Sequence, residues 1–441
     1  MEKSFSQKIL LGIQHVLAMF GATVLVPMLT GLNASLTLIC AGLGTLLFHG
    51  VTKRKVPVFL GSSFAFMGAI QYVLWDGGDN LGNASINLDN LAKVKGAIII
   101  AGLIYVLFAI LIKIIGYQKV TKILPPIVTG PMIIVIGLRL CTSATGNAFF
   151  KDSVNNGTFV PMKALVAALV ILIIIGVSVF AKGFLNLMPI LIALIVGYVI
   201  CIPLGILDTK SWGDAFHNAS FLSFTDSHIL DQFLVLPKFD LDAILAIAPI
   251  SLVTIIEHVG DITTNGAVVG KNFIANPGVH RTLIGDGLAT AMAGLFGGPA
   301  NTTYGENTGV LAVTKNYDPS CLRIAAVFAV ILGVFGKFGT IIQQVPPAVS
   351  GGISIVLFGM ISSVGVRILI NHKIDMSNSR NLMISSLILV LGIGVDKVIL
   401  PNTDGLSISG LAIAAILGII FAAILPEKTS TDSAAEKDSI E

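Results

Sequence analysis

Long apolar runs separated by short polar stretches fill the chain from Ile9 to Leu425. Each run is about 17 to 22 residues long, the length that an α-helix needs to cross the hydrocarbon core of a bilayer. Outer-membrane barrels instead alternate polar and apolar residues in strands of about ten residues. The pattern therefore predicts an all-α membrane protein with many spans.

The runs form two sets of seven spans on either side of a polar stretch, 207–240. The first set is predicted at 9–30, 35–51, 57–74, 96–116, 124–141, 160–180 and 184–206. The second set is predicted at 241–258, 281–298, 300–314, 321–338, 345–366, 382–400 and 406–425. The first run is too long for a cleaved signal peptide and contains Gln14 and His15, so we expect it to remain as the first span.

The distribution of basic residues predicts the orientation of these spans. Loops on the cytoplasmic side of a membrane are enriched in Lys and Arg. With the amino terminus in the cytoplasm, 18 of these residues fall on the inside and 8 on the outside. We therefore expect both termini in the cytoplasm and the long acidic loop, 207–240, on the outside.

Composition agrees with a membrane protein and excludes several other classes. Hydrophobic residues make up 54% of the chain, charged residues 12%, and the mean hydropathy is +0.91. Soluble domains carry roughly 25% charged residues. The net charge of +3 does not indicate nucleic-acid binding, because the basic residues lie in loops. The four cysteines form no CxxC pair, and no span contains an HExxH, DDxxD or GxSxG motif, so we expect no metal, no cofactor and no enzyme activity.

Two of the predicted spans are interrupted by polar and flexible residues. The third contains Gly-Ser-Ser-Phe at 61–64, and the tenth contains Asn-Thr-Thr-Tyr at 301–304. Unsatisfied polar groups are costly in hydrocarbon, so these residues are expected to face protein or a polar cavity. An odd number of spans in each half makes the two halves run in opposite directions, and interrupted spans at matching places in inverted repeats are typical of a transporter's substrate site. The alternative, strongest for the third span, is that Gly and Ser only allow close helix packing.

Three ionisable residues lie together near the end of the predicted eighth span. Glu257 and Asp261 are four residues apart, which places both carboxylates on one face of a helix. Acids inside a membrane mark paths for ions, protons or substrate, because inserting one costs roughly 2.5–3.5 kcal/mol. For Asp261 the alternative is a place at the cytoplasmic end of the helix, and His258 is expected to pack on another face.

Glu306 is the second candidate carboxylate, and it lies beside Gly305 at the break in the tenth span. Its oxygens accept hydrogen bonds, whereas the backbone N–H groups freed at the break donate them. This combination suits a flat ring that contains amide groups. His15 in the first span is expected to hold a neighbouring polar break in place.

At these residues the chain resembles the nucleobase-ascorbate transporter family, also called nucleobase:cation symporter family 2, over nearly its whole length. Residues 14–27, Gln-His-Val-Leu-Ala-Met-Phe-Gly-Ala-Thr-Val-Leu-Val-Pro, resemble the family's first span, and 61–66, Gly-Ser-Ser-Phe-Ala-Phe, its third. The family signature is Gln or Glu followed by Asn-x-Gly-x4-Thr and a basic residue. The chain matches this signature from Glu306 through Lys315.

The resemblance implies fourteen spans in two inverted repeats of seven, with short β-strands in spans 3 and 10. It also implies a core domain and a gate domain that move against each other during alternating access. The boundaries are expected at 1–122 (core, spans 1–4), 123–206 (gate, spans 5–7), 207–240 (extracytoplasmic loop), 241–338 (core, spans 8–11), 339–425 (gate, spans 12–14) and 426–441 (a polar cytoplasmic tail, expected to be disordered).

The residues of a nucleobase site follow from the same resemblance. The two glutamates and the backbone amides of Phe64 and Gly305 would hold the base. The residues implied for substrate binding are Ala22, Phe64, Glu257, Tyr304, Gly305 and Glu306. The residues considered for proton coupling are His15, Glu257, Asp261 and Glu306. Glu rather than Gln at the head of the signature resembles the branch that transports uracil, which favours uracil import with proton symport.

Two positions depart from that branch. Asp261 stands where uracil transporters carry His and purine transporters commonly carry Asp, and Phe358 stands where a Tyr hydroxyl is often found. A xanthine or other purine permease is therefore the alternative function. Oxygen atoms of Asp261, Asn307 and Thr308 leave sodium open as the coupling ion in place of the proton. An anion transporter is disfavoured, because two carboxylates in the pocket would repel anions.

The expected partners are uracil and the bilayer of an inner or plasma membrane. The resemblance further implies a homodimer through the gate domains.

Overall fold

The computed structural model describes residues 4–75, 86–116, 125–151, 157–395, 397–399 and 407–426. Among these residues, seven helices are long and apolar enough to cross a membrane, and four shorter helices are also apolar. The tail predicted at 426–441 lies outside the described residues, apart from Pro426.

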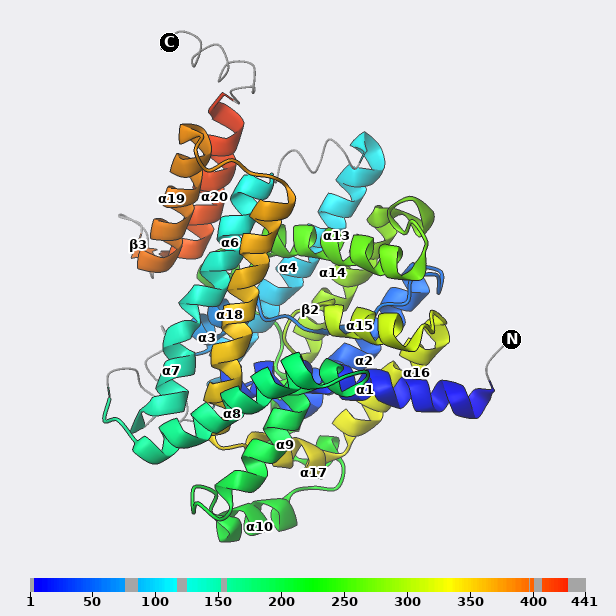
Figure 1. The fold of residues 1–441 in the computed structure, drawn as a ribbon, viewed down its shortest axis with the longest axis vertical. Helices are drawn as coiled ribbons and strands as arrows, with labels where there is room; N and C mark the ends of the chain where they lie inside the picture. The colour runs from blue at the N-terminus through cyan, green and yellow to red at the C-terminus, as the bar shows by residue number, and fades with distance from the viewer. Residues whose placement is uncertain are drawn as a thin grey trace.

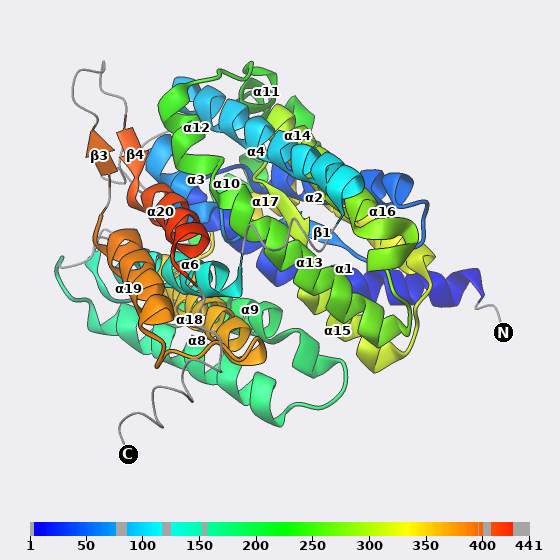
Figure 2. The ribbon, with the colours of Figure 1, turned by 90° about the horizontal axis from the view of Figure 1, so that it is seen from above.

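One group of helices is built around α4 and α14, which pack side by side (Figures 1 and 2). Helix α2 packs on α14 and on α16, and α16 packs on α1. We call this group the first bundle. Its helices are α1 (Phe5–Thr30), α2 (Ala34–Val51), α3 (Met67–Leu74), α4 (Leu88–Ile115), α12 (Leu241–Ile247), α13 (Ile250–Val269), α14 (Val279–Phe296), α15 (Gly305–Thr314) and α16 (Pro319–Val334).

A second group is built around α18, which contacts α6, α7, α8 and α9, while α6 also contacts α19 and α20. Figure 2 shows this second bundle beside the first. Its helices are α6 (Pro126–Arg139), α7 (Cys141–Phe149), α8 (Pro161–Phe180), α9 (Pro189–Cys201), α18 (Pro347–Asn371), α19 (Ser379–Gly394) and α20 (Gly410–Ile424).

Short elements complete the fold. The helical ones are η2 (Leu185–Leu187), α10 (Thr209–Asn218), η3 (Ser223–Thr225), α11 (Ser227–Leu234), η4 (Ile274–Gly278) and α17 (Gly336–Gln343). The strands are β1 (Leu60–Ser62), β2 (Asn301–Thr303), β3 (Lys397–Ile399) and β4 (Ser407–Ser409). β3 and β4 pair antiparallel. The hydrophobic pattern places 407–409 inside the last span, but these residues form β4 and α20 begins only at Gly410.

The eighth predicted span ends too early. α12 gives way to α13 at Pro249, and α13 then continues to Val269 rather than ending at 258. Glu257 and Asp261 therefore lie in the middle of α13, and the alternative that Asp261 ends the helix is wrong. The length of this span was underestimated because polar residues on the inner face of a helix lower its average hydropathy without breaking the helix.

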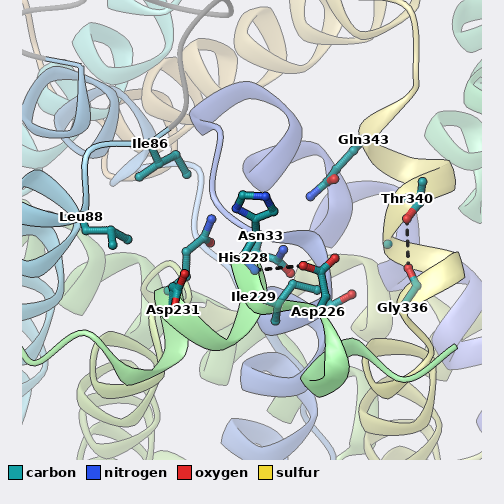
Figure 3. A pocket seen from close by; sticks show the side chains of 13 residues that line it. Asn33, Ile86, Leu88, Asp226, His228, Ile229, Asp231, Gly336, Thr340 and Gln343 are labelled. Atoms are coloured by element: carbon teal, nitrogen blue, oxygen red, sulfur yellow. Dashed lines mark hydrogen bonds between the residues drawn. The ribbon is translucent and has the colours of Figure 1, made fainter. Parts of the chain in front are cut away.

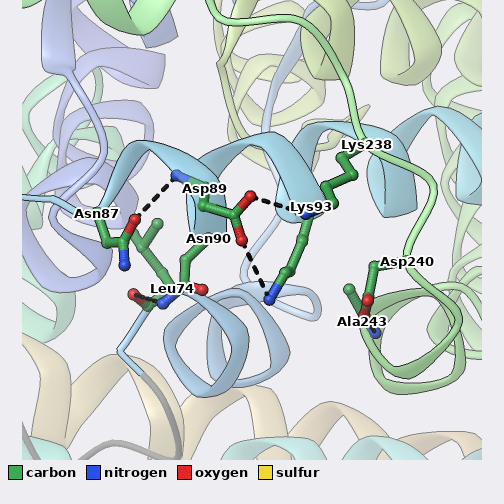
Figure 4. Close-up of polar contacts among 8 residues, drawn as sticks. All are labelled: Leu74, Asn87, Asp89, Asn90, Lys93, Lys238, Asp240 and Ala243. Carbon is green, nitrogen blue, oxygen red and sulfur yellow. Dashed lines mark hydrogen bonds and ion pairs between the residues drawn. The ribbon is translucent and has the colours of Figure 1, made fainter.

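The polar stretch 207–240, which we call the connecting segment, is folded and fixed to the first bundle. Lys95 of α4 is only 1% exposed, and its Nζ donates to carbonyl oxygens at the end of α11. The acceptors are Gln232, Phe233 and Val235, at 3.2, 3.1 and 2.6 Å. Lys238 forms an exposed ion pair with Asp89 at 2.9 Å, and Lys93 approaches the same carboxylate at 3.3 Å (Figure 4).

Candidate functional site

The two interrupted spans meet backbone to backbone at β1 and β2. The strands pair antiparallel, with Leu60 opposite Thr303 and Ser62 opposite Asn301, and all six strand residues are buried. The pairing satisfies backbone groups that no helix satisfies at these breaks, as a non-helical segment within a membrane requires. The strands implied by the family resemblance are therefore present.

Tyr304 fixes this strand crossing. Its Oη donates to Ser62 O at 2.8 Å, and Ser62 Oγ donates to Thr23 O of α1 at 2.9 Å. The ring lies directly against Gly61, where a Cβ atom would overlap it. Glycine at 61 is thus required by the close approach of the aromatic ring.

Buried side chains attach the crossing to the helices of the first bundle. Thr45 Oγ1 of α2 accepts from Leu60 N at 2.9 Å. Asn301 Nδ2 donates to Cys40 O of α2 at 2.9 Å, and Thr290 Oγ1 of α14 donates to Asn301 O at 2.7 Å. The strands are therefore held by α2 and α14 as well as by each other.

Three half-buried carboxylates gather beside the crossing: Glu257 and Asp261 from α13, and Glu306 from α15. They are close enough to interact electrostatically. Asp261 Oδ2 accepts from Thr303 Oγ1 of β2 at 2.7 Å. Glu306 lies in the first turn of α15, next to the backbone N–H groups that a helix start leaves without intrahelical partners. Gly305, at that start, is exposed, and a Cβ there would meet nothing within 4 Å.

The apolar side of the site joins the two bundles. Ala22 of α1, Tyr304 and Phe358 belong to one hydrophobic cluster, and half-buried Phe64 packs against it. Phe358 comes from α18 of the second bundle, so this cluster spans the boundary between the bundles. The residues expected to bind substrate therefore surround the strand crossing, where the bundles meet.

His15 is buried against the start of α15. Asn307 Nδ2 lies 3.1 Å from His15 Nδ1 and donates to His15 O at 3.0 Å. Both side chains are 0% exposed. The contact ties α1 to α15, which is the arrangement expected of a residue that holds the polar break in place.

Sequence analysis missed Asn265, which lies two helical turns after Glu257 and one after Asp261. Its Nδ2 donates to Pro57 O, just before β1, at 3.0 Å and to Thr308 Oγ1 of α15 at 3.1 Å. The spacing of four residues from Asp261 was a signal that it shares the polar face of α13.

Sequence analysis also missed Asp286 of α14, which forms a buried contact with His258. His258 Nδ1 lies 3.0 Å from Asp286 Oδ2, and both side chains are 0% exposed. No spacing along the chain relates the two residues, because they belong to different helices. His258 packs on another face than Glu257, as expected, and its partner there is the ionisable Asp286.

A cavity of about 460 Å³ lies away from the strand crossing, where the connecting segment meets α2 and α17 (Figure 3). Polar side chains of Asn33, Asp226, His228, Thr340 and Gln343 line it. Its lining includes none of the three carboxylates of the site.

Comparison with known proteins adds to this geometry. Residues 6–400 match the model of a family described as a permease family, Xan_ur_permease. A uracil permease of Bacillus subtilis (strain 168) is 42% identical over 419 residues, which cover 94% of this chain and 92% of that protein. A uracil permease of Escherichia coli (strain K12) is 36% identical over 414 residues, with 94% and 90% covered. A probable uracil permease of Pasteurella multocida (strain Pm70) is 38% identical over 434 residues, with 98% and 96% covered.

Two solved structures share the fold. The murine Slc26a9 anion transporter in its inward-facing state has a TM-score of 0.68 at 11% identity, covering 96% of this chain and 69% of that one. The transmembrane domain of the cyanobacterial bicarbonate transporter BicA has a TM-score of 0.59 at 16% identity, with 94% and 96% covered. At these identities the likeness concerns the fold alone.

Proposed function

Because the chain belongs to the nucleobase-ascorbate transporter family of permeases, we propose that it imports uracil by secondary active transport coupled to protons. The observation that carries the proposal is the meeting of two interrupted spans beside Glu257 and Glu306. Full-length similarity to uracil permeases supports uracil as the substrate.

Uracil presents ring N–H donors and carbonyl acceptors at the edge of a flat apolar ring. In our proposal, the carboxylates of Glu257 and Glu306 accept from the ring N–H groups. The backbone amides of Phe64 and Gly305 donate to the carbonyls, and Gly305 is an exposed residue at the start of α15. Ala22 and the aromatic rings supply the apolar contact.

Proton coupling would use the same carboxylates. Like charges held close together in a poorly solvated site repel, so neighbouring carboxylates share protons. We propose that Asp261, together with the two glutamates, carries the proton that enters with uracil. His15, held by Asn307, would assist by keeping the start of α15 in place.

The two bundles correspond in this proposal to a core and a gate domain within fourteen spans arranged as inverted repeats. Movement of the first bundle against the second would expose the strand crossing to each side of the membrane in turn. Both termini would lie in the cytoplasm, the membrane would be the inner or plasma membrane, and the second bundle would supply the contact of a homodimer.

A purine permease is the second candidate, because Asp261 occupies the position at which purine transporters commonly carry Asp. Its coupling ion would be a proton or sodium.

Uptake of radiolabelled uracil into proteoliposomes tests the proposal. With an inward proton gradient, uptake is expected to collapse when a protonophore is added and to be unaffected by excess xanthine. Absence of uracil uptake, or strong competition by xanthine, would favour a purine permease instead. Uptake that depends on a sodium gradient and is unaffected by the protonophore would show that sodium, rather than the proton, is the coupling ion.

A further inference from the structure

The buried pair of His258 and Asp286 lies behind the proposed substrate site. His258 follows Glu257 in the chain, so the two side chains leave α13 about 100° apart. Glu257 shares the face of Asp261, which contacts β2, whereas His258 faces α14. One helix therefore presents a substrate carboxylate on one side and an anchored imidazole on another.

Asp286 has a fixed position, because the glycines on either side of it are in tight contact with other helices. A Cβ at Gly285 would lie 2.7 Å from the Phe48 ring of α2, and a Cβ at Gly287 would lie 2.6 Å from Gly102 O of α4. α14 packs along α2 and α4, whereas α13 meets α14 at fewer residues. The carboxylate of Asp286 is thus part of the rigid side of the contact.

The pair has both aromatic and ionisable neighbours among the described residues. The Phe48 ring stands edge-on to the imidazole, with ring centroids 6.4 Å apart. Ionisable groups near the pair are Glu257 and Asp261 on α13 and Tyr105 on α4, and His49 lies on α2 beyond Phe48.

We propose that His258 and Asp286 are positioning residues that fix the rotation of α13 against α14 and thereby the place of the Glu257 carboxylate in the substrate site. The inference rests on the proposed uracil transport. Neither residue contacts substrate in this account, and both act through Glu257.

Three variants separate the effect of charge at the contact between His258 and Asp286 from the effect of side-chain shape. Asn at 258 still offers an amide N–H to Asp286, and Asn at 286 still accepts from the imidazole. Each single variant therefore offers a donor and an acceptor at this contact but leaves one ionisable group buried without its counter-charge, which is the costly situation for a buried pair. The double variant, His258→Asn with Asp286→Asn, also offers a donor and an acceptor at this contact and has no charge.

The test is titration calorimetry of uracil with the purified full-length protein at several pH values. Each single variant is expected to bind uracil at least ~10-fold more weakly than the wild type, as coupled pairs do when one partner is lost. The double variant is expected to recover most of that loss. Thr254→Val is the matched control, since Thr254 lies one turn earlier on the same face and its hydroxyl donates to Ile250 O of its own helix at 3.2 Å. Its affinity is expected to stay within ~2-fold of the wild type.

The pH dependence distinguishes positioning by an ion pair from a merely structural role. Relative to the wild type, His258→Asn should recover affinity as the pH falls, because protonation removes the lone negative charge of Asp286. Asp286→Asn has no carboxyl group at this contact, so it should not show this recovery at low pH.

Wild-type affinity in both single variants would overturn the inference. So would an equal loss at every pH that the double variant does not repair. If the single variants fail to fold, a stable double variant that binds uracil supports the inference, and a double variant that also fails to fold overturns it. Absence of uracil binding by the wild type would overturn the proposed function and this inference with it.

Discussion

The three carboxylates beside the strand crossing differ in how they are held, and this difference suggests different roles. Asp261 is fixed by the hydroxyl of Thr303, whereas Glu306 lies at the start of α15 and Glu257 on the middle of α13. A carboxylate at a helix start is stabilised by the partial positive charge of that end. In our account, the two glutamates hold the base, and Asp261 mainly carries the proton.

Replacing either glutamate tests the substrate contacts. Glu257→Gln and Glu306→Gln are each expected to lower the apparent affinity for uracil by roughly 10- to 100-fold, because a hydrogen bond to a charged group contributes about 1.5–3 kcal/mol. The measurement is uptake into proteoliposomes, with Asp214→Asn at an exposed position of α10 as the control. Normal uptake by both glutamine variants would refute the site assignment.

Replacing Asp261 separates binding from coupling. Asp261→Asn keeps an acceptor for the Thr303 hydroxyl but has no group to protonate. We expect exchange of external for internal uracil to continue while accumulation driven by a proton gradient is lost. Both rates are measured on the same vesicles, and retention of gradient-driven accumulation would show that Asp261 does not carry the proton.

Among the elements, β1 and β2 show which features the sequence predicts and which it does not. The polar interruptions at 61–64 and 301–304 predict two breaks that face protein or a polar cavity, because their residues cannot face lipid. That short strands form at these breaks and meet is implied by the family resemblance. The register of the strands was not predictable, since it depends on ties such as that of Asn301 to α2, which only the packed fold brings together. The contact of His258 with Asp286 was hidden for the same reason.

The lengths of the helices were predicted less well than their positions along the chain. The end of the eighth span was placed too early because Glu257 and Asp261 lower the hydropathy of a helix that in fact continues to Val269. The helices α10 and α11 of the connecting segment were missed, since each is shorter than the roughly 11–18 residues over which apolar periodicity is read.

The strand crossing is sensitive to volume at Gly61. Gly61→Ala would place a Cβ against the Tyr304 ring, and overpacking of this kind costs about 1–3 kcal/mol of stability. We expect a lower midpoint of thermal unfolding in detergent and weaker uracil binding. Gly50→Ala, at an exposed position of α2 with nothing within 4 Å, is the control. An unchanged midpoint in Gly61→Ala would contradict the close packing of Tyr304 on β1.

At the scale of the whole molecule, the site lies between two bundles, and the connecting segment is attached to the first of them. Lys95 anchors the end of α11 from inside the first bundle. If the bundles move against each other during transport, the connecting segment therefore moves with the first bundle.

The two lysines that hold the connecting segment should contribute unequally to the stability of the protein. Lys95→Met leaves carbonyl groups at the end of α11 without their donor, which costs about 1–3 kcal/mol. Lys238→Met removes an exposed ion pair with Asp89, which contributes little to stability because water and salt screen it. Thermal unfolding in detergent should show a clear loss for the first variant and a small one for the second. A larger loss of thermal stability for Lys238→Met than for Lys95→Met would show that the exposed ion pair, rather than Lys95, holds the connecting segment.

The most direct test of the account is a structure of the purified protein determined with saturating uracil. We predict that the ring lies beside the strand crossing, with its N–H groups about 2.7–3.2 Å from the carboxylates of Glu257 and Glu306 and a carbonyl facing the amide of Gly305. Uracil bound instead in the cavity between α11 and α17, with the strand crossing empty, would contradict the account.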